Sequence, residues 1–479
     1  MTRGSRWLSL LVLAGLCAGV GSVQAQPAVP PESSVQQTLG FEAAWQQLRA
    51  HSGKLASAQA ALQGKRLQGE GLQGLGGPTV GLSAATYAYN ANLTVDLNPI
   101  NQRLLQLGQP LQAPLQAMHI PATAFPSLPA SYTYNQHGSG DTASVSLMWP
   151  LYVGGVTDAA QALVAAQGDE ALADAQRTED ELMTLLVQRY FGAQLAVHAA
   201  RLRQTAYDNV LAHDRAVEKM LAAGVVSRVE RLQARAAAQD AQRNALKAQD
   251  DAELAVIALA RTVGASARVL PQSPLFVLNA PAQPMDYFLQ AAMLRHPGLA
   301  KVAAKKAQAQ SLHAAEEGLR KPQVFAFGQH ALASGNPDWV VGLGARWTLF
   351  DAVDRDKLAA ASLQQVAQAE HSDAQARSDL ALLVERNWRV LEQAHRQFFS
   401  LQPGLELAQE VLRLRTAGLR EGTSTAVDLM DAETQLLKVQ TERAQAAYDY
   451  VVALAQLLEG CGLSQEFGAY LARADVKVE

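Results

Sequence analysis

The chain has 479 residues, a formal net charge of −4, and a composition that is 18% charged and 6% aromatic. A slightly acidic chain offers nucleic acid no electrostatic footprint, so nucleic-acid binding is excluded as its function. Its two cysteines, Cys17 and Cys461, are too few for a disulfide framework.

Residues 1–25 have the features of a bacterial-type secretory signal. Arg3 and Arg6 precede an apolar stretch, and small residues lead to a cleavage site after Ala25. Cys17 follows a leucine, where a lipid-acceptor cysteine would follow glycine or alanine, so we expect no lipid anchor. No later stretch has about 18 consecutive apolar residues, so the sequence predicts no spanning helix in the mature chain.

The rest of the chain is an internal duplication. The segment that ends near Gly74 matches the segment that ends near Gly318 at an offset of 244 residues. Further on, Gly224 aligns with Gly422 at an offset of 198. The smaller offset means that the first copy carries 46 additional residues, which we place at about 91–141.

The duplication divides the chain into six parts. They are a signal peptide (1–25), an N-terminal extension (26–37), a first repeat (38–265), an inter-repeat linker (266–285), a second repeat (286–465) and a C-terminal tail (466–479).

Both copies predict the same elements in the same order. In the first copy we expect a helix at about 38–73, strands at about 79–89 and 142–150, and a long helical hairpin at about 156–263. In the second copy we expect a helix at about 286–319, strands at about 323–332 and 339–350, and a long hairpin at about 354–459. Glycine and proline end each first helix, and alternating apolar residues mark the strands.

The hairpin arms are longer than the depth of an ordinary domain. A proline-free run of about 65 residues makes a helix of roughly 100 Å. Ala, Leu and Val at three and four spacing predict coiled-coil packing of the arms, and Pro403 predicts a kink in the second copy. A coiled-coil rod or spacer is the simplest alternative.

The strands argue against a plain rod. In the second copy Trp339, Val341 and Leu343 share one face with Trp347, an arrangement typical of transmembrane strands with interfacial aromatics. A soluble hairpin with one face in a hydrophobic core would show the same alternation of apolar residues. Four strands cannot close a barrel, since the smallest membrane barrels have about eight, so several chains would have to contribute.

These features together resemble the TolC-like outer-membrane efflux protein family. The resemblance rests on the duplicated order of elements, the Trp-x-Leu-aromatic strand ends, and the sequence GTSTAVDLMDAE after the hairpin turn at Gly422. It implies a mainly α fold with a small β part. Three copies would form a 12-stranded barrel in the outer membrane of a Gram-negative bacterium, on a periplasmic α-helical tunnel. The resemblance also implies a periplasmic adaptor and an inner-membrane exporter as partners, with Gly224 and Gly422 at the periplasmic tip.

Two aspartates follow the second hairpin turn. Asp428 follows Thr425 by three residues, as Glu230 follows Ser227 in the first copy, which is the capping-box spacing. Asp431 has no charged counterpart, because the matching residue is Gln233. Residues three apart share a helix face. The resemblance assigns Asp428 and Asp431 to a constricting ring of carboxylates that would favour cations, while a helix cap and a solvated charge are the alternatives.

Other site residues follow from the same resemblance. At the hairpin tips we expect adaptor contacts, made by Gly224, Ser227, Arg228, Gly422 and Thr425. At the membrane interface we expect aromatic anchors, at Trp149, Tyr152, Trp339, Trp347 and Phe350. Leu419 and Ser424 replace the polar latch residues of the best-known member. Arg228 and Arg231 are expected to be solvated charges, with other latches or adaptor contacts as the alternatives.

No motif supports catalysis, a metal or a cofactor. The ten histidines are scattered singly. The stretch HGSGD at 137–141 lacks the spacing of a nucleophile elbow, and the glycines of GLGGPTV precede a strand instead of following one. We therefore expect that the protein is not an enzyme.

The topology that the resemblance implies would place the 46-residue insertion between the first two strands and outside the cell. It could fold over the mouth, lengthen the hairpin or form a mobile loop, and the last is the expectation.

The leading functional hypothesis is a passive exit duct for drugs, toxic compounds or metals in a tripartite efflux system. The exit duct of a type I protein secretion system, and a periplasmic adaptor or structural coiled coil, are the alternatives.

Overall fold

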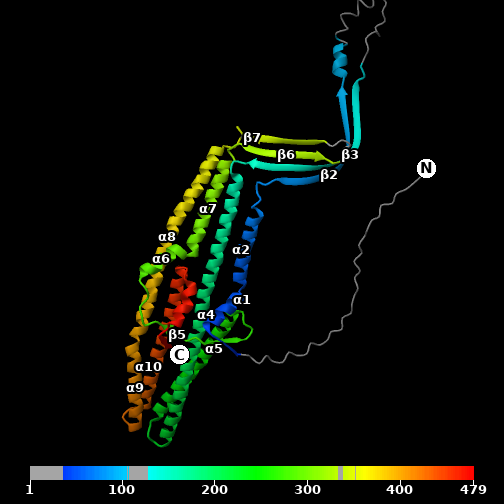
Figure 1. Ribbon diagram of the computed structural model, residues 1–479. Helices are drawn as coiled ribbons and strands as arrows, with labels where there is room; N and C mark the ends of the chain where they lie inside the picture. The colour runs from blue at the N-terminus through cyan, green and yellow to red at the C-terminus, as the bar shows by residue number, and fades with distance from the viewer. Residues whose placement is uncertain (1–35, 105, 107–127, 333–337, 351, 479) are drawn as a thin grey trace, which may run out of the picture.

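A computed structural model describes residues 36–104, 106, 128–332, 338–350 and 352–478. The molecule is a long bundle of helices with a four-stranded sheet at one end (Figure 1). Within the described residues, no helix is both long and apolar enough to cross a membrane.

The first repeat holds the longest helix. Its elements are β1 (Gln36–Leu39), α1 (Phe41–His51), α2 (Gly53–Gly71), β2 (Thr79–Asp96), β3 (Ser131–Tyr152), α4 (Val156–Ala222) and α5 (Arg228–Val263). The 67 residues of α4 extend over roughly 100 Å at 1.5 Å per residue. Small side chains line its contact with α5, where the buried residues include Ala234, Ala238 and Ala245.

The second repeat follows the same order with one break. Its elements are β4 (Arg268–Pro271), β5 (Leu275–Val277), α6 (Met285–Arg295), α7 (Pro297–Gly318), β6 (Gln323–Ala331), β7 (Trp339–Arg346), α8 (Arg355–Ser400), α9 (Gln402–Glu421), α10 (Ala426–Gly460), a 3₁₀ turn (Ser464–Glu466), α11 (Phe467–Ala472) and β8 (Val476–Val478). Pro403 was expected to kink the helix, but its effect is stronger. Pro403 lies in the first turn of α9, and the helix is interrupted at Leu401.

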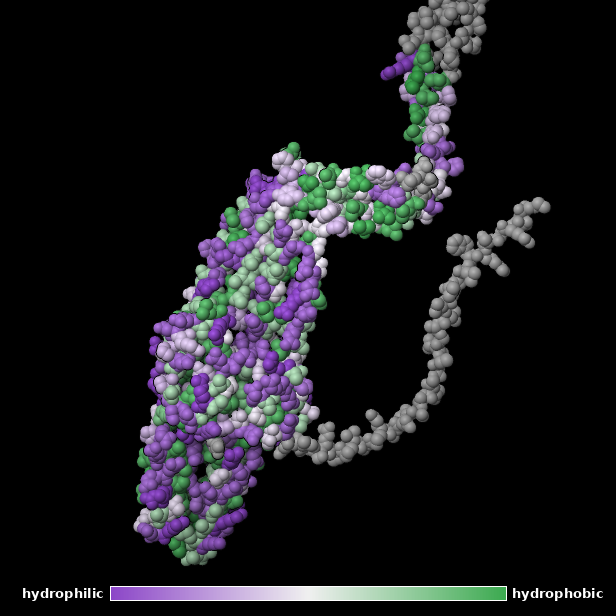
Figure 2. All heavy atoms as spheres, in the orientation of Figure 1, coloured by the Kyte–Doolittle hydropathy of each residue, from purple (hydrophilic) through white to green (hydrophobic). Residues whose placement is uncertain are grey.

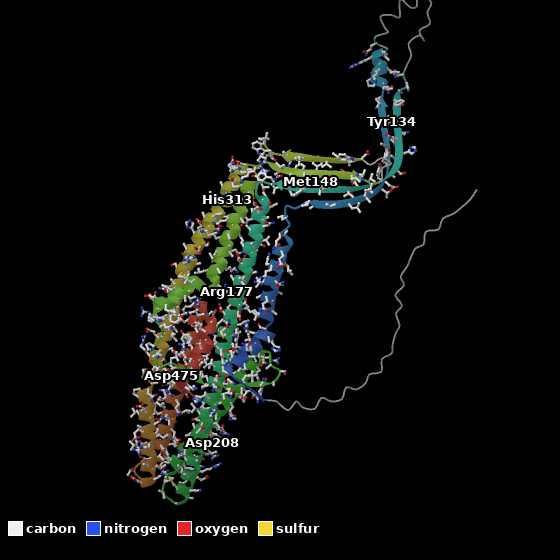
Figure 3. The ribbon with its side chains drawn as sticks, viewed as in Figure 1. Tyr134, Met148, Arg177, Asp208, His313 and Asp475 are labelled. Atoms are coloured by element: carbon white, nitrogen blue, oxygen red, sulfur yellow. The ribbon has the colours of Figure 1, made fainter. Side chains whose placement is uncertain are left out.

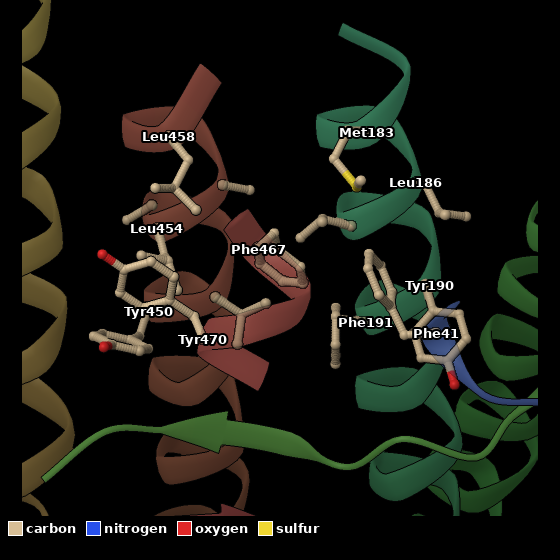
Figure 4. Packing of buried hydrophobic residues seen from close by; sticks show 14 of the residues in the cluster. Phe41, Met183, Leu186, Tyr190, Phe191, Tyr450, Leu454, Leu458, Phe467 and Tyr470 are labelled. Atoms are coloured by element: carbon tan, nitrogen blue, oxygen red, sulfur yellow. The ribbon is translucent and has the colours of Figure 1, made fainter. Parts of the chain in front are cut away.

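The main hydrophobic core lies midway along the bundle. Phe191 of α4 packs against the rings of Phe41 and Phe467 at centroid distances of 5.6 and 6.0 Å (Figure 4). The Tyr190 hydroxyl donates to the Leu39 carbonyl at 2.6 Å. Each fully buried aromatic ring adds about 1.5–3 kcal/mol of hydrophobic stabilisation.

The linker and the tail are built into this core. β1 pairs in parallel with β4, and β5 pairs antiparallel with β8. Residues 266–285 and 466–478 are therefore structural parts and not simple connectors. Leu275, Phe276 and Val277 of β5 are all fully buried.

The four-stranded sheet has the order β2-β3-β6-β7, and all its pairs are antiparallel. The β2–β3 ladder runs without a break from Thr79 opposite Met148 to Asp96 opposite Ser131. The expectation of a loop was therefore wrong for residues 91–96 and 131–141, which lengthen the hairpin. Its central part, residues 107–127, lies outside the described residues.

The last strand is shorter than expected. β7 ends at Arg346, and the Trp347 indole N–H donates to the carbonyl of Arg320, beyond the end of α7, at 3.2 Å. Trp347 and Phe350 therefore lie beyond the strand, and this hydrogen bond ties Trp347 to the end of α7.

Candidate functional site

The end of the bundle far from the sheet is formed by two helical hairpin turns (Figure 1). In the first, Gly224 follows α4 with a φ of +71°. In the second, Gly422 ends α9 with a φ of +75°. Glycine adopts this left-handed conformation without steric cost, which lets each helix stop and reverse.

Both returning helices begin with a capping box, as the sequence predicted. The Ser227 hydroxyl accepts from the Glu230 backbone, and the Glu230 carboxylate accepts from the Ser227 N–H at 2.7 Å. In the second turn, the Asp428 N–H donates to Thr425 Oγ1 at 3.1 Å and the Asp428 carboxylate accepts from the Thr425 N–H at 3.0 Å. The cap role of Asp428 is thus confirmed.

The two aspartates differ in their surroundings. Hydrogen bonding from the Thr425 backbone, then from its hydroxyl, lowers the pKa of Asp428, and Arg415 at 3.9 Å contributes less. Asp431 is exposed one helical turn later, and its carboxylate makes no hydrogen bond or ion pair with any described residue. Of the two, Asp431 is therefore the carboxylate without a partner among the described residues.

Apolar packing and a polar contact hold the two hairpins together near the tip. Met430 of α10 is buried against Val210, Val217 and Ala234 of the first hairpin. Nearby, His213 Nε2 lies 3.1 Å from Glu433 Oε1 and joins α4 to α10.

Arg231 is an ion-pair partner and not the solvated charge that the sequence suggested. Its guanidinium pairs with Asp214 and, at 3.4 Å, with Glu218. The Arg231 side chain is only 16% exposed, because it lies back along α4. Sequence reasoning missed this pair, since the two residues are 17 positions apart on different helices.

The second turn is closed by its own bonds. The Ser424 N–H donates to the Gly418 carbonyl at 3.1 Å, and the Thr423 hydroxyl donates to the same oxygen at 3.2 Å. Ser424 therefore stabilises the turn itself, and the described side-chain pairs near the tip are made by Arg231, His213 and Arg415.

The expected docking residues all lie at this end. Arg228 and Ser227 are exposed, as are Gly224, Gly422 and Thr425. The structure adds three apolar side chains that sequence reasoning overlooked, Val225, Val229 and Leu232, which are 67%, 63% and 59% exposed. The signal was present in the sequence GVVSRVERL, where a solvated turn would carry polar residues.

The sheet at the other end has one apolar and one polar face. Directly paired residues of neighbouring strands share a face, and successive residues alternate. The register gathers apolar side chains on one face, namely Val80, Leu82, Val145, Leu147, Trp149, Trp339, Val341 and Leu343. The opposite face is more polar, with Ser83, Ser144, Ser146, Gln329 and Arg346, and it also carries Met148, Phe325, Phe327 and Val340.

The apolar face is uncovered. Val80, Leu82, Val341 and Leu343 are between 69% and 74% exposed, and Figure 2 shows hydrophobic side chains gathered along the sheet. Such a face needs a lipid or protein cover, because a continuous apolar surface is unfavourable in water.

The expected interfacial aromatics fall at both ends of this face. Trp149 and Tyr152 lie at the helical end, where Arg346 ends β7 and Trp347 follows. Trp339, opposite His330, lies at the far end. The eight residues of β7 cover roughly 26 Å at about 3.3 Å per residue. At the tilt of about 40° usual for barrel strands this spans roughly 20 Å, somewhat less than the apolar band of about 25 Å.

Comparison with known proteins shows what this arrangement is similar to. Residues 288–462, most of the second repeat, match the family described as outer membrane efflux protein. No curated protein sequence matches the chain. The resemblance to TolC-like outer-membrane efflux proteins is confirmed for this part of the chain.

Solved structures share the fold over nearly the whole chain. VceC from Vibrio cholerae is 14% identical with a TM-score of 0.69, covering 88% of this chain and 96% of its own. The CmeC outer membrane channel of Campylobacter jejuni is 13% identical with a TM-score of 0.69, covering 91% and 90%. The open MtrE outer membrane channel of Neisseria gonorrhoeae is 16% identical with a TM-score of 0.67, covering 88% and 89%. At these identities the likeness establishes the fold.

Proposed function

We propose that three copies of this chain, which has the fold of outer membrane channels, form an exit duct through the outer membrane. The duct would release small toxic molecules from a tripartite efflux pump. The observation that carries this is the four-stranded sheet with an uncovered apolar face. Such a sheet cannot close alone, and three of them supply twelve strands, an even number within the range of membrane barrels.

The polarity of the two faces supports a water-filled barrel. The apolar face suits lipid, and the serines and Arg346 of the other face suit an aqueous lumen. On this second face the rings of Phe327 and Phe325 lie over Gly342 and Gly344, which have no side chains. A periplasmic adaptor or structural rod would leave the apolar face without a role.

A duct of this kind needs no catalytic centre, in keeping with the match to an efflux family. Substrate choice would lie with the inner-membrane exporter, reached through an adaptor that docks at the helical tips. Val225, Val229 and Leu232 give the first tip an apolar contact surface, and Arg228 stands beside them. We assign the adaptor contact to this tip.

The carboxylates at the second tip form the proposed cation-selective constriction. Among the described residues of one chain, no three metal-ligating side chains are grouped for a metal ion. A ring therefore requires the copies to bring their Asp431 and Asp428 residues together around the axis. Like charges held close attract cations.

Two experiments test these proposals. Deleting the gene should raise drug accumulation in the cell, and the purified protein should conduct in planar bilayers. Unchanged drug accumulation together with a lack of conductance would refute the duct. For the ring, Asp431→Asn should lower cation selectivity, with Asp251→Asn on the exposed side of α5 as the matched control. Equal selectivity of the two variants would rule out the ring at Asp431.

A further inference from the structure

The β2–β3 hairpin continues well beyond its partners as a two-stranded ribbon. The pairing of β3 with β6 ends at Ser144 opposite Ala331, while β2 and β3 stay paired to Asp96 and Ser131. Figure 1 shows the ribbon turning sharply where β6 ends and β7 begins. Figure 3 places Met148 on the part of β3 within the sheet and Tyr134 on the part beyond the turn. The eleven residues 86–96 of β2 extend over roughly 35 Å at about 3.3 Å per residue.

At this turn the apolar residues of β2 pass from one face of the ribbon to the other. The register continues without a bulge, so residues 79, 81, 83 and onward in steps of two keep one face throughout β2. Within the sheet that face is polar, with Ser83 opposite Ser144. Beyond the turn the same face becomes aromatic and aliphatic, with Tyr87, Tyr89, Leu93, Val95, Tyr132 and Tyr134.

The other face changes from apolar to polar. Within the sheet it carries Val80 and Leu82, which we assign to lipid. Beyond the turn it carries polar residues, namely Thr86, Asn90, Asn92, Thr94, Asp96, Ser131, Thr133, Asn135, His137, Ser139 and Asp141. A face so polar suits water, so the ribbon stands beyond the lipid.

Two glycines keep the aromatic face flat. Gly140 lies opposite Tyr87 and Gly138 opposite Tyr89. A Cβ on Gly140 would come within 2.9 Å of the Tyr87 hydroxyl, and one on Gly138 within 3.0 Å of the Tyr89 ring. The rings therefore lie against glycine backbone, and a larger residue in either position would lift them. Even so, Tyr87, Tyr134 and Tyr132 remain 49%, 51% and 58% exposed.

We propose that the aromatic faces of the three ribbons in the assembled duct pack against one another over its outer mouth and narrow it. This rests on the proposed duct. The aromatic face continues the face that lines the lumen, so in a closed cylinder it points inward, toward the axis. The partner that lies across that axis is a second copy of the same face. Packing there removes the exposed tyrosines from water, as apolar burial requires.

Cysteine cross-linking of adjacent residues tests the proposal. Tyr134→Cys lies on the inner face and Asn135→Cys on the outer face, so the second is a matched control. The pair Tyr89→Cys and Asn90→Cys repeats the test on β2. The native Cys461 is fully buried and does not compete. Oxidation in intact cells should give a covalent dimer of chains at the inner positions and none at the outer ones.

Conductance provides a second readout. Exchanging Tyr87 and Tyr134 together for serine should raise single-channel conductance, whereas Asn135→Ser should leave it unchanged. A conducting trimer that gives no cross-link at Tyr134→Cys and Tyr89→Cys, or equal cross-links on both faces, overturns the packing of the ribbons and leaves the duct intact. A chain that neither assembles nor conducts overturns both.

Discussion

The joint between the sheet and the helices depends on a close contact of two glycines. Gly154 lies between β3 and α4 with a φ of +73°, and a Cβ added there would come within 2.1 Å of the carbonyl oxygen of Gly318, the last residue of α7. Gly155 follows with a φ of +90° and has no heavy atom within 4 Å of its built Cβ. Adjacent residues with the same backbone handedness therefore differ in the space available.

We predict that Gly154→Ala is clearly more destabilising than Gly155→Ala. A left-handed backbone conformation destabilises a non-glycine residue by roughly 1–2 kcal/mol, and this cost applies to both variants. Overpacking costs about 1–3 kcal/mol more and applies to Gly154→Ala alone, because the atom it meets belongs to backbone and cannot rotate away. The difference between the two variants should therefore be about 1–3 kcal/mol.

The assay is the temperature at which the detergent-solubilised assembly dissociates, followed by gel mobility and circular dichroism. Each 1 kcal/mol lowers a melting temperature by about 2–4 °C in a domain of 150–250 residues, and by less in a larger protein. The Gly154→Ala assembly should dissociate several degrees below the Gly155→Ala assembly. Equal dissociation temperatures would show that the contact with Gly318 does not hold the sheet on the helices.

Three further predictions concern the helices. Thr425→Ala removes the cap of α10 and should destabilise the tip by about 1 kcal/mol, seen as faster hydrogen exchange at the start of α10 and not at α5; equal exchange would contradict the cap. Arg231→Ala leaves the 12%-exposed Asp214 without its main partner and should cost about 3 kcal/mol, whereas the exposed Arg228→Ala should cost under about 0.5 kcal/mol; similar melting curves would refute the pair. Burial raises the pKa of Asp180 from 3.8 to about 6, so its contribution to stability is greatest below pH 3.8 and falls as pH rises through 6. Asp180→Asn should therefore melt above wild type at pH 7.5, and this gain should vanish near pH 4; a gain independent of pH would exclude ionisation as its cause.

The sequence allows the parts that depend on local pattern to be predicted. The glycine-matched duplication, the capping boxes at Ser227 and Thr425, and the alternation around Val145 each reflect short-range chemistry. The assembly of three copies was predicted from the resemblance, because no local sequence pattern specifies it.

The core was beyond prediction because its contacts join distant segments. β5 has three residues and β8 has three, too few to show a period, and they meet only after the two repeats have folded. The extent of the β2–β3 ribbon was missed for a related reason. The apolar residues change face at Thr86, so a search for one continuous apolar face ends there. Arg231 and Trp347 were misplaced because their partners, Asp214 and Arg320, lie on other helices or beyond their ends.

The central claim is that one chain supplies only part of a closed cylinder whose apolar outer face contacts lipid. The most direct test is the mass of the purified protein in detergent, measured by native mass spectrometry. The account predicts three chains per particle and aggregation when detergent is removed. A single chain that stays dispersed in water without detergent would contradict it.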